Sequence, residues 1–496
     1  MINNSNVVER IKNFDKYAVL VIGDLIYRSL SLEAHYSDEG IHPRGVLLYY
    51  MNNGWTFSLH LINGTTLFQG ILFLIEIFFA FQLVIGYRTW FATLMTWIFT
   101  ISLHNRNAVI LNGGDTLMGN LLFFSMFVPL GAYFSIDSLQ NSSQNKKTSN
   151  QVLTLGTLAI LLQVAFMYIF TAILKMRTDV WQSGKAIYHS LSLCQCVTPF
   201  GEYLLQFKQI LEFLTSVVLY FELIGPFLMF MPILNGQIRL ILIILFFILQ
   251  VGFGATLTIC LFPWASVVAI LPFLPPYFWD SVLKKVRVEE RWTHFISSFQ
   301  KRIFSNPILE KILLFQPNIT INTLKPSAFT NVIVSFFLLL IFWWNLSPLD
   351  PRYTLPPQLS TLGNTFRLIQ NWAMFAPPGT RVVWIVIPGE LKNGKTVDIL
   401  QNGKDVSWDK PKSPTLYYKN QRWLSLLATS ISPGRASSLV PPITNYFCKD
   451  WNKKHIGEAQ VTEVEFYVVY QNILENYELS DPEKLFIWKQ ACLPKN

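Results

Sequence analysis

The stretch Gln163–Ala186, QVAFMYIFTAILKMRTDVWQSGKA, runs from a strongly apolar segment directly into a lysine and then into a turn with Asp, Trp and Gly. Lys175 therefore stands where the hydrocarbon of a membrane gives way to water. Such surroundings disfavour the charged ammonium, and a lysine that gives up its proton can act as a base. A lysine at the end of a transmembrane helix can equally extend its ammonium to the lipid headgroups. This stretch alone leaves both interpretations open.

The composition indicates a protein that crosses a membrane several times. Of the 496 residues, 51% are hydrophobic and only 14% are charged, with 40 Phe and 15 Trp, as is typical of polytopic membrane proteins. The net charge of +9 does not indicate a nucleic-acid partner, because Lys and Arg lie mostly between apolar runs, where they set membrane orientation. The first sixteen residues are polar and mixed in charge, so we expect no cleavable signal peptide and an anchor in the first span.

Apolar runs predict a polytopic α-helical membrane bundle of about nine spans, since a helix needs about 20 residues to cross a bilayer. The runs are 17–33, 66–86, 89–108, 116–134, 152–174, 210–232, 238–260, 261–279 and 327–346. The first carries Asp24 and Arg28 at i,i+4 spacing, which could neutralise each other inside the bundle. The eighth is broken by Pro263, Pro272 and Pro275, which favours a kinked or re-entrant helix.

Basic residues predict the orientation of the chain. Residues 280–325 carry a large excess of Lys and Arg over Asp and Glu, so this loop of the membrane domain (1–349) should be cytoplasmic. Within it, Val286–Phe304 mixes aromatic and charged residues in a pattern suited to a helix on the membrane surface. Counting spans then predicts a cytoplasmic N-terminus and an extracytoplasmic second domain (350–496).

The second domain should be small and rich in β-strands. Strands are predicted at Arg381–Ile387, Thr396–Leu400 and Val461–Tyr470, from β-branched, aromatic and alternating patterns. Asn393-Gly394 is typical of a hairpin turn, and a helix is expected over Ser437–Lys454.

Cysteine and histidine positions favour one disulfide and no metal site. Cys448 and Cys492 are the cysteines of the outer domain, and a pair outside the cytoplasm can oxidise and persist. We therefore predict a Cys448–Cys492 disulfide and a free thiol at Cys260. The seven histidines are scattered, and the sequence has no HExxH motif and no paired CxxC motifs, so no metal is expected.

Three polar connections are predicted on the outer face of the bundle: Glu33–Thr65, His104–Asp115 and Lys175–Lys208. Loops on a rigid scaffold are where binding sites are usually built. The candidate pocket residues in these loops are Tyr36, Asp38, Arg44, Arg106, Asn112, Gly113, Gly114, Asp115 and Trp181. The alternative for the Gly-Gly-Asp segment is structural: it turns the chain, and Asp115 is the N-cap of the next helix.

Two carboxylates lie within apolar runs, Glu76 in LIEIFF and Glu222 in LYFELIG. A buried carboxylate in lipid is costly enough to imply a function or a partner. The pair could form a proton path in a transporter, or each could be protonated and hydrogen-bonded to a neighbouring helix.

Taken in order, four motifs resemble the horizontally transferred transmembrane domain shared with vitamin K-dependent gamma-carboxylase. They are YSDEG-x-x-PR from Tyr36, RN-x-x-x-x-NGGD from Arg106, Q…YIFTAILK…W-x-x-G-x-A from Gln163, and Leu214-Thr215…Glu222…Pro226. The segment Asn371–Pro377, NWAMFAP, is also similar to bacterial members. The match covers most of residues 15–280.

The resemblance implies that Lys175 matches the lysine that deprotonates reduced vitamin K in the carboxylase. In that enzyme a base formed by oxygenation then takes a proton from a peptidyl glutamate, so a secreted or membrane protein substrate is implied. Gln250 aligns with a functional histidine. Glutamine can hydrogen-bond but cannot shuttle a proton near neutral pH, so the resemblance leaves carboxylation itself open.

Three functional hypotheses follow. The first is a membrane enzyme that uses a lipid-soluble cofactor, such as a reduced quinone or naphthoquinone, with Lys175 as base. The second is a proton-coupled transporter using Glu76 and Glu222. The third is a non-enzymatic membrane protein whose outer domain binds a partner. Membrane lipid is an expected partner in all three.

Overall fold

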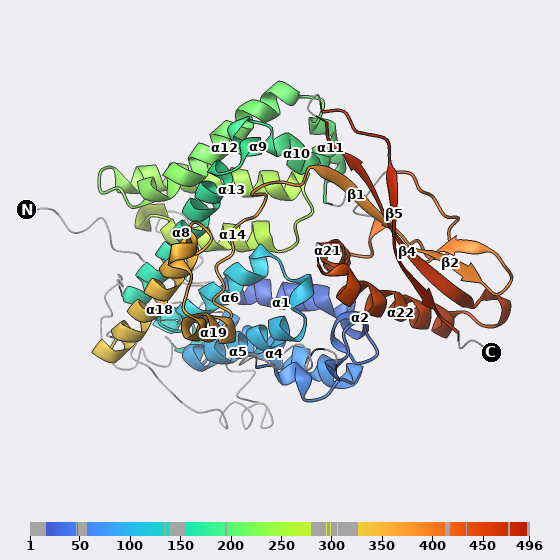
Figure 1. Cartoon of the computed structure of the whole chain (residues 1–496). Coiled ribbons are helices and arrows are strands. Elements are labelled where there is room, and N and C mark those ends of the chain that lie inside the picture. Colours follow the sequence, from blue (N-terminus) through green and yellow to red (C-terminus); the bar gives the residue numbers. More distant parts are fainter. Residues whose placement is uncertain are drawn as a thin grey trace, which may run out of the picture.

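The computed structural model describes residues 16–45, 47, 57–132, 135–137, 154–193, 196–278, 326–411, 417–432, 434–474 and 477–493, with the single positions 294, 298 and 305. The chain forms a bundle of helices and, from its C-terminal part, an antiparallel sheet with two helices (Figure 1). In Figure 1 the sheet, in orange and red, lies at one side of the bundle.

A helix forms within each of the nine predicted apolar runs. The helices are α1 (Lys16–Ser29), α4 (Thr66–Ile85), α5 (Thr89–Arg106), α6 (Gly113–Ser125), α8 (Leu155–Met176), α12 (Lys208–Met229), α13 (Asn235–Thr256), α14 (Phe262–Ile270) and α18 (Ala328–Leu346). By length and composition, five of them could cross a membrane: α4, α8, α12, α13 and α18. The structure therefore supports a helical membrane protein with five candidate spans, and the larger number of nine is not confirmed.

Three of these helices, α1, α6 and α14, are much shorter than a membrane crossing requires. Helices α1 and α6 have 14 and 13 residues, fewer than the roughly 20 that a crossing needs. Helix α14 gives way to a 3₁₀ turn at Leu271–Phe273, where Pro272 interrupts the apolar run, as expected for a proline inside a helix. The eighth run is thus a short helix rather than a full span.

Capping residues set the ends of the long helices. The Thr65 side chain accepts a hydrogen bond from the Phe68 N–H at the start of α4, and Gly86, at φ +70°, ends it. Thr154 caps α8 in the same way through the Thr157 N–H. Both patterns satisfy backbone groups that have no partner within the helix.

Several long helices present large apolar side chains on their outer faces. Phe213 of α12 is 68% exposed and Leu339 of α18 is 67% exposed. On α12 the exposed apolar residues follow i+3 and i+4 spacing and so form one stripe along the helix: Ile210, Phe213, Val217, Tyr220, Ile224 and Phe227. Contiguous apolar surfaces are rare on proteins that face water, and this one fits contact with lipid.

Short helices build the connections in which the motifs were predicted. They are α2 (Leu32–Tyr36), η2 (Leu59–Leu61), η3 (Ala108–Ile110), α9 (Asp179–Gln182), α10 (Ala186–Ser192) and α11 (Pro199–Leu204).

The C-terminal sheet is centred on one long strand. Its strands are β1 (Arg381–Val386), β2 (Pro388–Leu391), β3 (Thr396–Asp398), β4 (Val461–Asn472) and β5 (Glu483–Ala491). All pairings are antiparallel: β4 pairs with β1, β2 and β5, and β2 pairs with β3. The predicted turn joins β2 to β3, with Gly394 at φ +79°. Strand β5 was not predicted, because its side chains are mostly exposed and carry no buried face.

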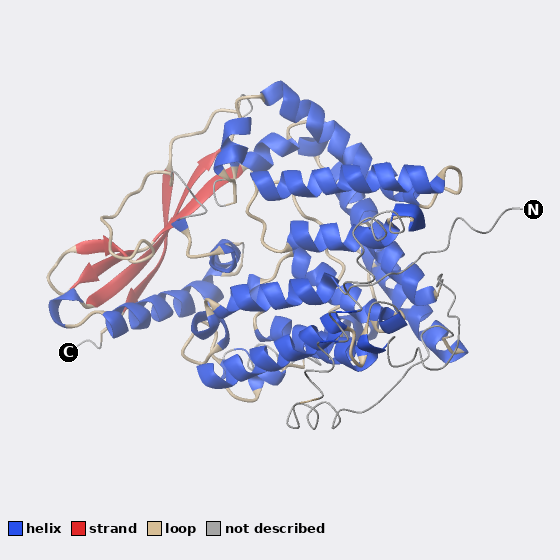
Figure 2. Ribbon diagram, turned by 180° about the vertical axis from the view of Figure 1, so that it is seen from behind, coloured by secondary structure: helices blue, strands red, loops and turns tan. Residues whose placement is uncertain are grey.

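Two helices accompany the sheet, α21 (Gln421–Ser430) and α22 (Ala436–Lys454). Helix α22 packs on β4 and β5, and Figure 2 shows the strands gathered into one sheet beside this long helix. Cys448 of α22 forms a disulfide with Cys492, which follows β5, with the two Cα atoms 5.1 Å apart. This is the pair expected from the sequence, and Cys260 is a free thiol.

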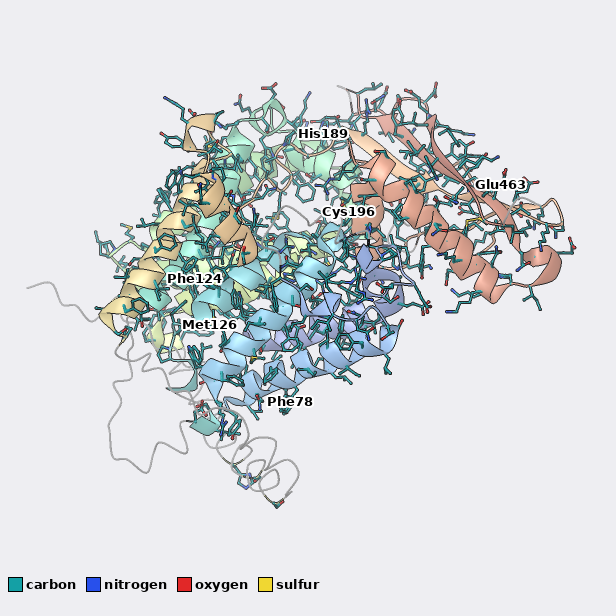
Figure 3. The ribbon with its side chains drawn as sticks, turned by 60° about the horizontal axis from the view of Figure 1, so that its bottom comes forward. Phe78, Phe124, Met126, His189, Cys196 and Glu463 are labelled. Carbon is teal, nitrogen blue, oxygen red and sulfur yellow. A yellow bond between two sulfur atoms is a disulfide. The ribbon has the colours of Figure 1, made fainter. Side chains whose placement is uncertain are left out.

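The side chains divide into the same two regions in Figure 3, where Phe78 and Phe124 lie among the bundle helices and Glu463 lies on the sheet. The basic loop 280–325, the predicted surface helix Val286–Phe304 and the first fifteen residues lie outside the described residues, apart from positions 294, 298 and 305. The predicted orientation in the membrane therefore stays a prediction.

Candidate functional site

Lys175 lies in the last turn of α8 and is buried, with 4% of its surface exposed. Its Nζ atom donates to Oε2 of Glu222, on α12, at 2.6 Å. The sequence had pointed to these residues separately, as a base and as an intramembrane carboxylate. The fold joins them in one buried ion pair.

The Trp181 ring lies beside the lysine. The Lys175 Nζ atom lies 4.5 Å from the centroid of the Trp181 ring, a geometry in which the ring face attracts a cation. The Trp181 Nε1–H donates to the backbone oxygen of Phe375 at 2.7 Å. The indole is thus held in place by the segment that links the bundle to the sheet.

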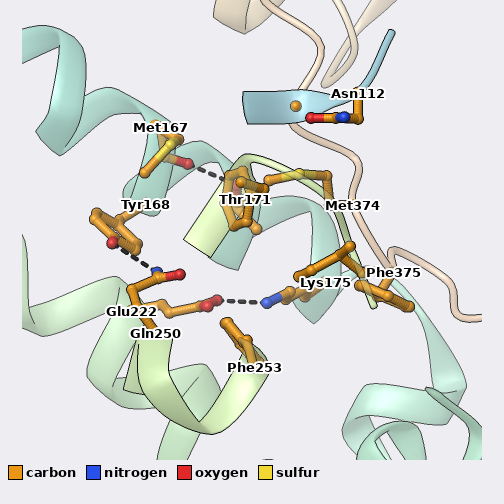
Figure 4. A pocket seen from close by; sticks show the side chains of 13 residues that line it. Asn112, Met167, Tyr168, Thr171, Lys175, Glu222, Gln250, Phe253, Met374 and Phe375 are labelled. Atoms are coloured by element: carbon orange, nitrogen blue, oxygen red, sulfur yellow. Dashed lines mark hydrogen bonds and ion pairs between the residues drawn. The ribbon is translucent and has the colours of Figure 1, made fainter. Parts of the chain in front are cut away.

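Lys175 and Glu222 face a chamber of about 240 Å³ (Figure 4). Its lining residues are Asn112, Gly113, Met167, Tyr168, Thr171, Lys175, Glu222, Gln250, Phe253, Ile259, Phe262, Met374 and Phe375. The linker residues Met374 and Phe375 close one side, although the domain boundary drawn from the sequence assigned them to the outer domain. A Cβ atom at Gly113 would lie 2.4 Å from the Met374 sulfur, so a larger residue at this position would require the Met374 side chain to move.

A second, more apolar pocket of about 440 Å³ adjoins the chamber and shares Lys175, Phe253 and Phe375 with it. Most of its other lining residues are apolar side chains, and eight of these belong to α12 and α13. Val217 and Ile248 in this lining are 44% and 59% exposed. The pocket therefore opens on a surface suited to lipid, and Lys175 stands between that surface and the chamber.

Two amide side chains in the chamber have unused hydrogen-bonding atoms. Gln250 donates through Nε2 to the Tyr168 hydroxyl at 2.9 Å, and its buried Oε1 has no partner. Asn112 accepts through Oδ1 from the Gly114 N–H at 2.8 Å, and its buried Nδ2 has no partner.

Asp115 belongs to a different cluster, a buried ion network formed by Asp24, Arg28, Asp115 and Arg422. The Arg28 guanidinium donates to Asp24 and Asp115, each at 2.5 Å. Arg422 of α21 donates to Asp115 at 2.5 Å and to Asp24 at 2.6 Å. The predicted Asp24–Arg28 pair is present, but it is half of a four-residue network.

The expectation that Asp115 is the N-cap of its helix is wrong. Asn112 is the N-cap, and Asp115 closes a capping box by accepting from the Asn112 backbone N–H at 2.8 Å. Arg422 was missed because an arginine on an amphipathic helix more than 300 residues from its partner carries no local signal.

The remaining candidates in the loops stabilise those loops. Tyr36 accepts from Arg28 through its hydroxyl at 2.6 Å. Asp38 forms an ion pair with Arg44 at 2.8 Å. Arg106 is buried and donates to the backbone oxygens of His42 and Ser37. None of these four side chains is among the chamber's lining residues.

Glu76 and Glu222 have separate partners. Glu76 accepts from the Thr100 hydroxyl at 2.8 Å, between α4 and α5, whereas Glu222 pairs with Lys175. The described contacts thus provide no connection between the two carboxylates. Within the described ranges, no group of three or more His, Cys, Asp or Glu side chains could hold a metal ion.

Several residues that line the chamber were not predicted as site residues, among them Tyr168, Thr171, Phe253, Met374 and Phe375. The last two lie in the NWAMFAP segment, which could have indicated them. Comparisons of the chain with protein-family models, with curated proteins and with solved structures find no match in any of the three sets.

Proposed function

We propose that this chain is an integral-membrane enzyme of the vitamin K-dependent gamma-carboxylase-like transmembrane family. It takes a lipid-soluble, quinol-type ligand from the bilayer and uses Lys175 as a base. The observation that carries the proposal is the buried Lys175–Glu222 pair, 2.6 Å apart, where an apolar pocket that opens toward lipid adjoins the chamber. The order of motifs around Lys175 is the further support.

The residues of the chamber fit such a ligand. The unpartnered Gln250 Oε1 and Asn112 Nδ2 can meet polar groups of a ring, and the adjoining apolar pocket can hold a hydrocarbon chain. When bound, a quinol supplies an acidic hydroxyl whose proton the Lys175 amine can accept.

Glu222 makes a free amine accessible without a change in net charge. The pair is neutral as ammonium and carboxylate, and it is equally neutral after the proton moves from Nζ to Oε2. Proton transfer inside the pair therefore avoids the cost of an isolated charge in a buried site. When the amine accepts a proton, the ammonium that forms lies against the Trp181 ring, which stabilises it.

The proposal stops at this proton transfer. Gln250 cannot take the part of a histidine that moves protons, so carboxylation of a peptidyl glutamate is not assigned to this chain. The β-rich domain is proposed to lie outside the cytoplasm, where a secreted or membrane protein substrate could reach it. The transporter hypothesis gains no support, because the described contacts do not link Glu76 to Glu222.

The test has two parts. Mass spectrometry of lipids that co-purify with the wild-type protein should find a quinone. Naphthalene-1,4-diol, added without oxygen, should then show the absorbance of its monoanion when bound to the wild type. The same absorbance is expected with Lys208→Met, a control substitution at the start of α12, the helix that carries Glu222. Lys175→Met should bind the diol without this spectral change. No diol binding, or an identical spectrum for Lys175→Met, would show the proposal to be wrong.

A further inference from the structure

The chamber contains two fixed amide groups that each lack one partner. Gln250 is completely buried, and its hydrogen bond to Tyr168 holds the side chain so that Oε1 is left over. The Asn112 side chain is held by the hydrogen bond that its Oδ1 accepts from the Gly114 N–H, and its Nδ2 has no hydrogen-bond partner. A buried polar atom without a partner is destabilising, so each of these atoms is a candidate contact for a ligand.

The two unused atoms are of opposite kinds. Gln250 offers an acceptor, and Asn112 offers a donor. They come from different elements, and Figure 4 draws them apart, with Thr171 between them. Other buried amides with unused atoms, such as Gln163 and Asn120, do not line this chamber.

We propose that Gln250 and Asn112 determine which ligand the chamber accepts. The ligand is an apolar ring with a hydroxyl that donates to Gln250 Oε1 and a second oxygen that accepts from Asn112 Nδ2. A ligand with one hydroxyl, such as a simple lipid alcohol, would satisfy only one amide, and a diether would leave Gln250 without a donor. This inference rests on the proposed function and adds the recognition of two separate oxygens.

The two contacts have different chemical signatures. An ether oxygen accepts a hydrogen bond but cannot donate one. Gln250 therefore distinguishes a hydroxyl from an ether, whereas Asn112 distinguishes an oxygen from no oxygen. Three probes separate these effects: 4-methoxy-1-naphthol has both features, 1,4-dimethoxynaphthalene lacks the donor, and 1-naphthol lacks the second oxygen.

The experiment measures the dissociation constants of the three probes for the full-length protein in detergent. The wild type should bind 4-methoxy-1-naphthol about tenfold more tightly than either other probe, the order of magnitude of one hydrogen bond. Gln250→Met should reduce the preference over 1,4-dimethoxynaphthalene and keep the preference over 1-naphthol. Asn112→Ser, which retains an N-cap oxygen, should do the reverse. Gln163→Met is the control that should change neither ratio.

Equal affinity of the wild type for all three probes would overturn the inference, and this comparison needs no variant that might fail to fold. The inference would also be overturned if Gln250→Met and Asn112→Ser both kept both preferences. Ionisation of naphthalene-1,4-diol beside Lys175 would still stand in that case, so only the recognition by Gln250 and Asn112 would be lost. If none of the four naphthalene compounds binds, the inference and the proposed function both fail.

Discussion

Lys175 and Glu222 are 47 positions apart in the chain, and each alone would be a costly charge within the bundle. Their pairing makes the site neutral, and the Trp181 ring covers the cation. The proposed base chemistry at this position therefore depends on a contact between α8 and α12 rather than on any property of the lysine alone.

A double-mutant cycle at this pair should give a large coupling. Lys175→Met or Glu222→Leu alone leaves one buried group without its partner and should destabilise the protein by roughly 3–5 kcal/mol. The double variant should be clearly more stable than either single one, because it buries no charge. Melting temperatures in detergent measure this, and simple additivity of the two single effects would show that the pair does not interact.

Asp398 gives a pH dependence in the β-rich domain. Burial raises its pKa to about 6, although hydrogen bonds from the Leu400 and Gln401 N–H groups act in the opposite direction. In the unfolded state the pKa of an Asp side chain is about 3.9, so the folded state binds the proton more tightly. The stability from this group is thus greatest below about pH 4, falls as the pH rises to about 6, and is level above that.

The fall should amount to at most about 3 kcal/mol for a shift of this size. Asp398→Asn should remove this part of the pH dependence while keeping an oxygen that accepts from Leu400. Melting temperatures of the wild type and the variant between pH 4 and 7 compare the two. Parallel pH profiles for the two proteins would contradict the assignment.

At the scale of elements, α21 is the piece that ties the sheet domain to the bundle. Its Arg422 enters the bundle and donates to Asp24 of α1 and Asp115 of α6. Two arginines balance two aspartates there, so the network is neutral only when α21 is in place.

Arg422→Met should therefore leave two carboxylates against Arg28 alone. We expect a loss of roughly 3–5 kcal/mol, the usual cost of removing one member from a buried charge network. Melting temperature and protease sensitivity of the C-terminal domain would report it. Arg435→Met, at an exposed arginine just before α22, is the matched control, and equal effects of the two substitutions would contradict this account.

At the scale of the whole molecule, the C-terminal domain contacts the bundle in a second region besides Arg422. The Tyr477 hydroxyl donates to Glu212 of α12 at 2.6 Å. The centroids of the Tyr477 and Tyr188 rings are 4.1 Å apart. With the linker residues Met374 and Phe375 in the chamber wall, the domain is bound to the face of the bundle that holds the site.

Membrane orientation is testable by cysteine labelling. Asp405 lies in an exposed loop of the C-terminal domain. In intact cells, an impermeant thiol reagent should label Asp405→Cys in a form of the protein whose free cysteines have been replaced. Glu290→Cys, in the basic loop, should be labelled only after the cells are opened. Labelling of position 290 instead of position 405 in intact cells would reverse the predicted orientation.

The sequence by itself determined the features that depend on local order. Nine apolar runs became nine helices, because hydrophobic length and capping residues act within one segment. The strands at Arg381, Thr396 and Val461, the turn at Gly394 and the short eighth helix follow from local patterns in the same way. Lys175 was identified because an apolar run that ends in lysine is visible in one stretch.

Only the tertiary structure decided which of these features act together. It paired Lys175 with Glu222, placed Asp115 with Arg422 rather than at the chamber, and brought Met374 and Phe375 back into the bundle. Each contact joins residues far apart in the chain, so no local propensity encodes it. Strand β5 was not predicted for a related reason. Its pairing with β4 stabilises it, whereas its own side chains are mostly exposed and give no pattern of burial.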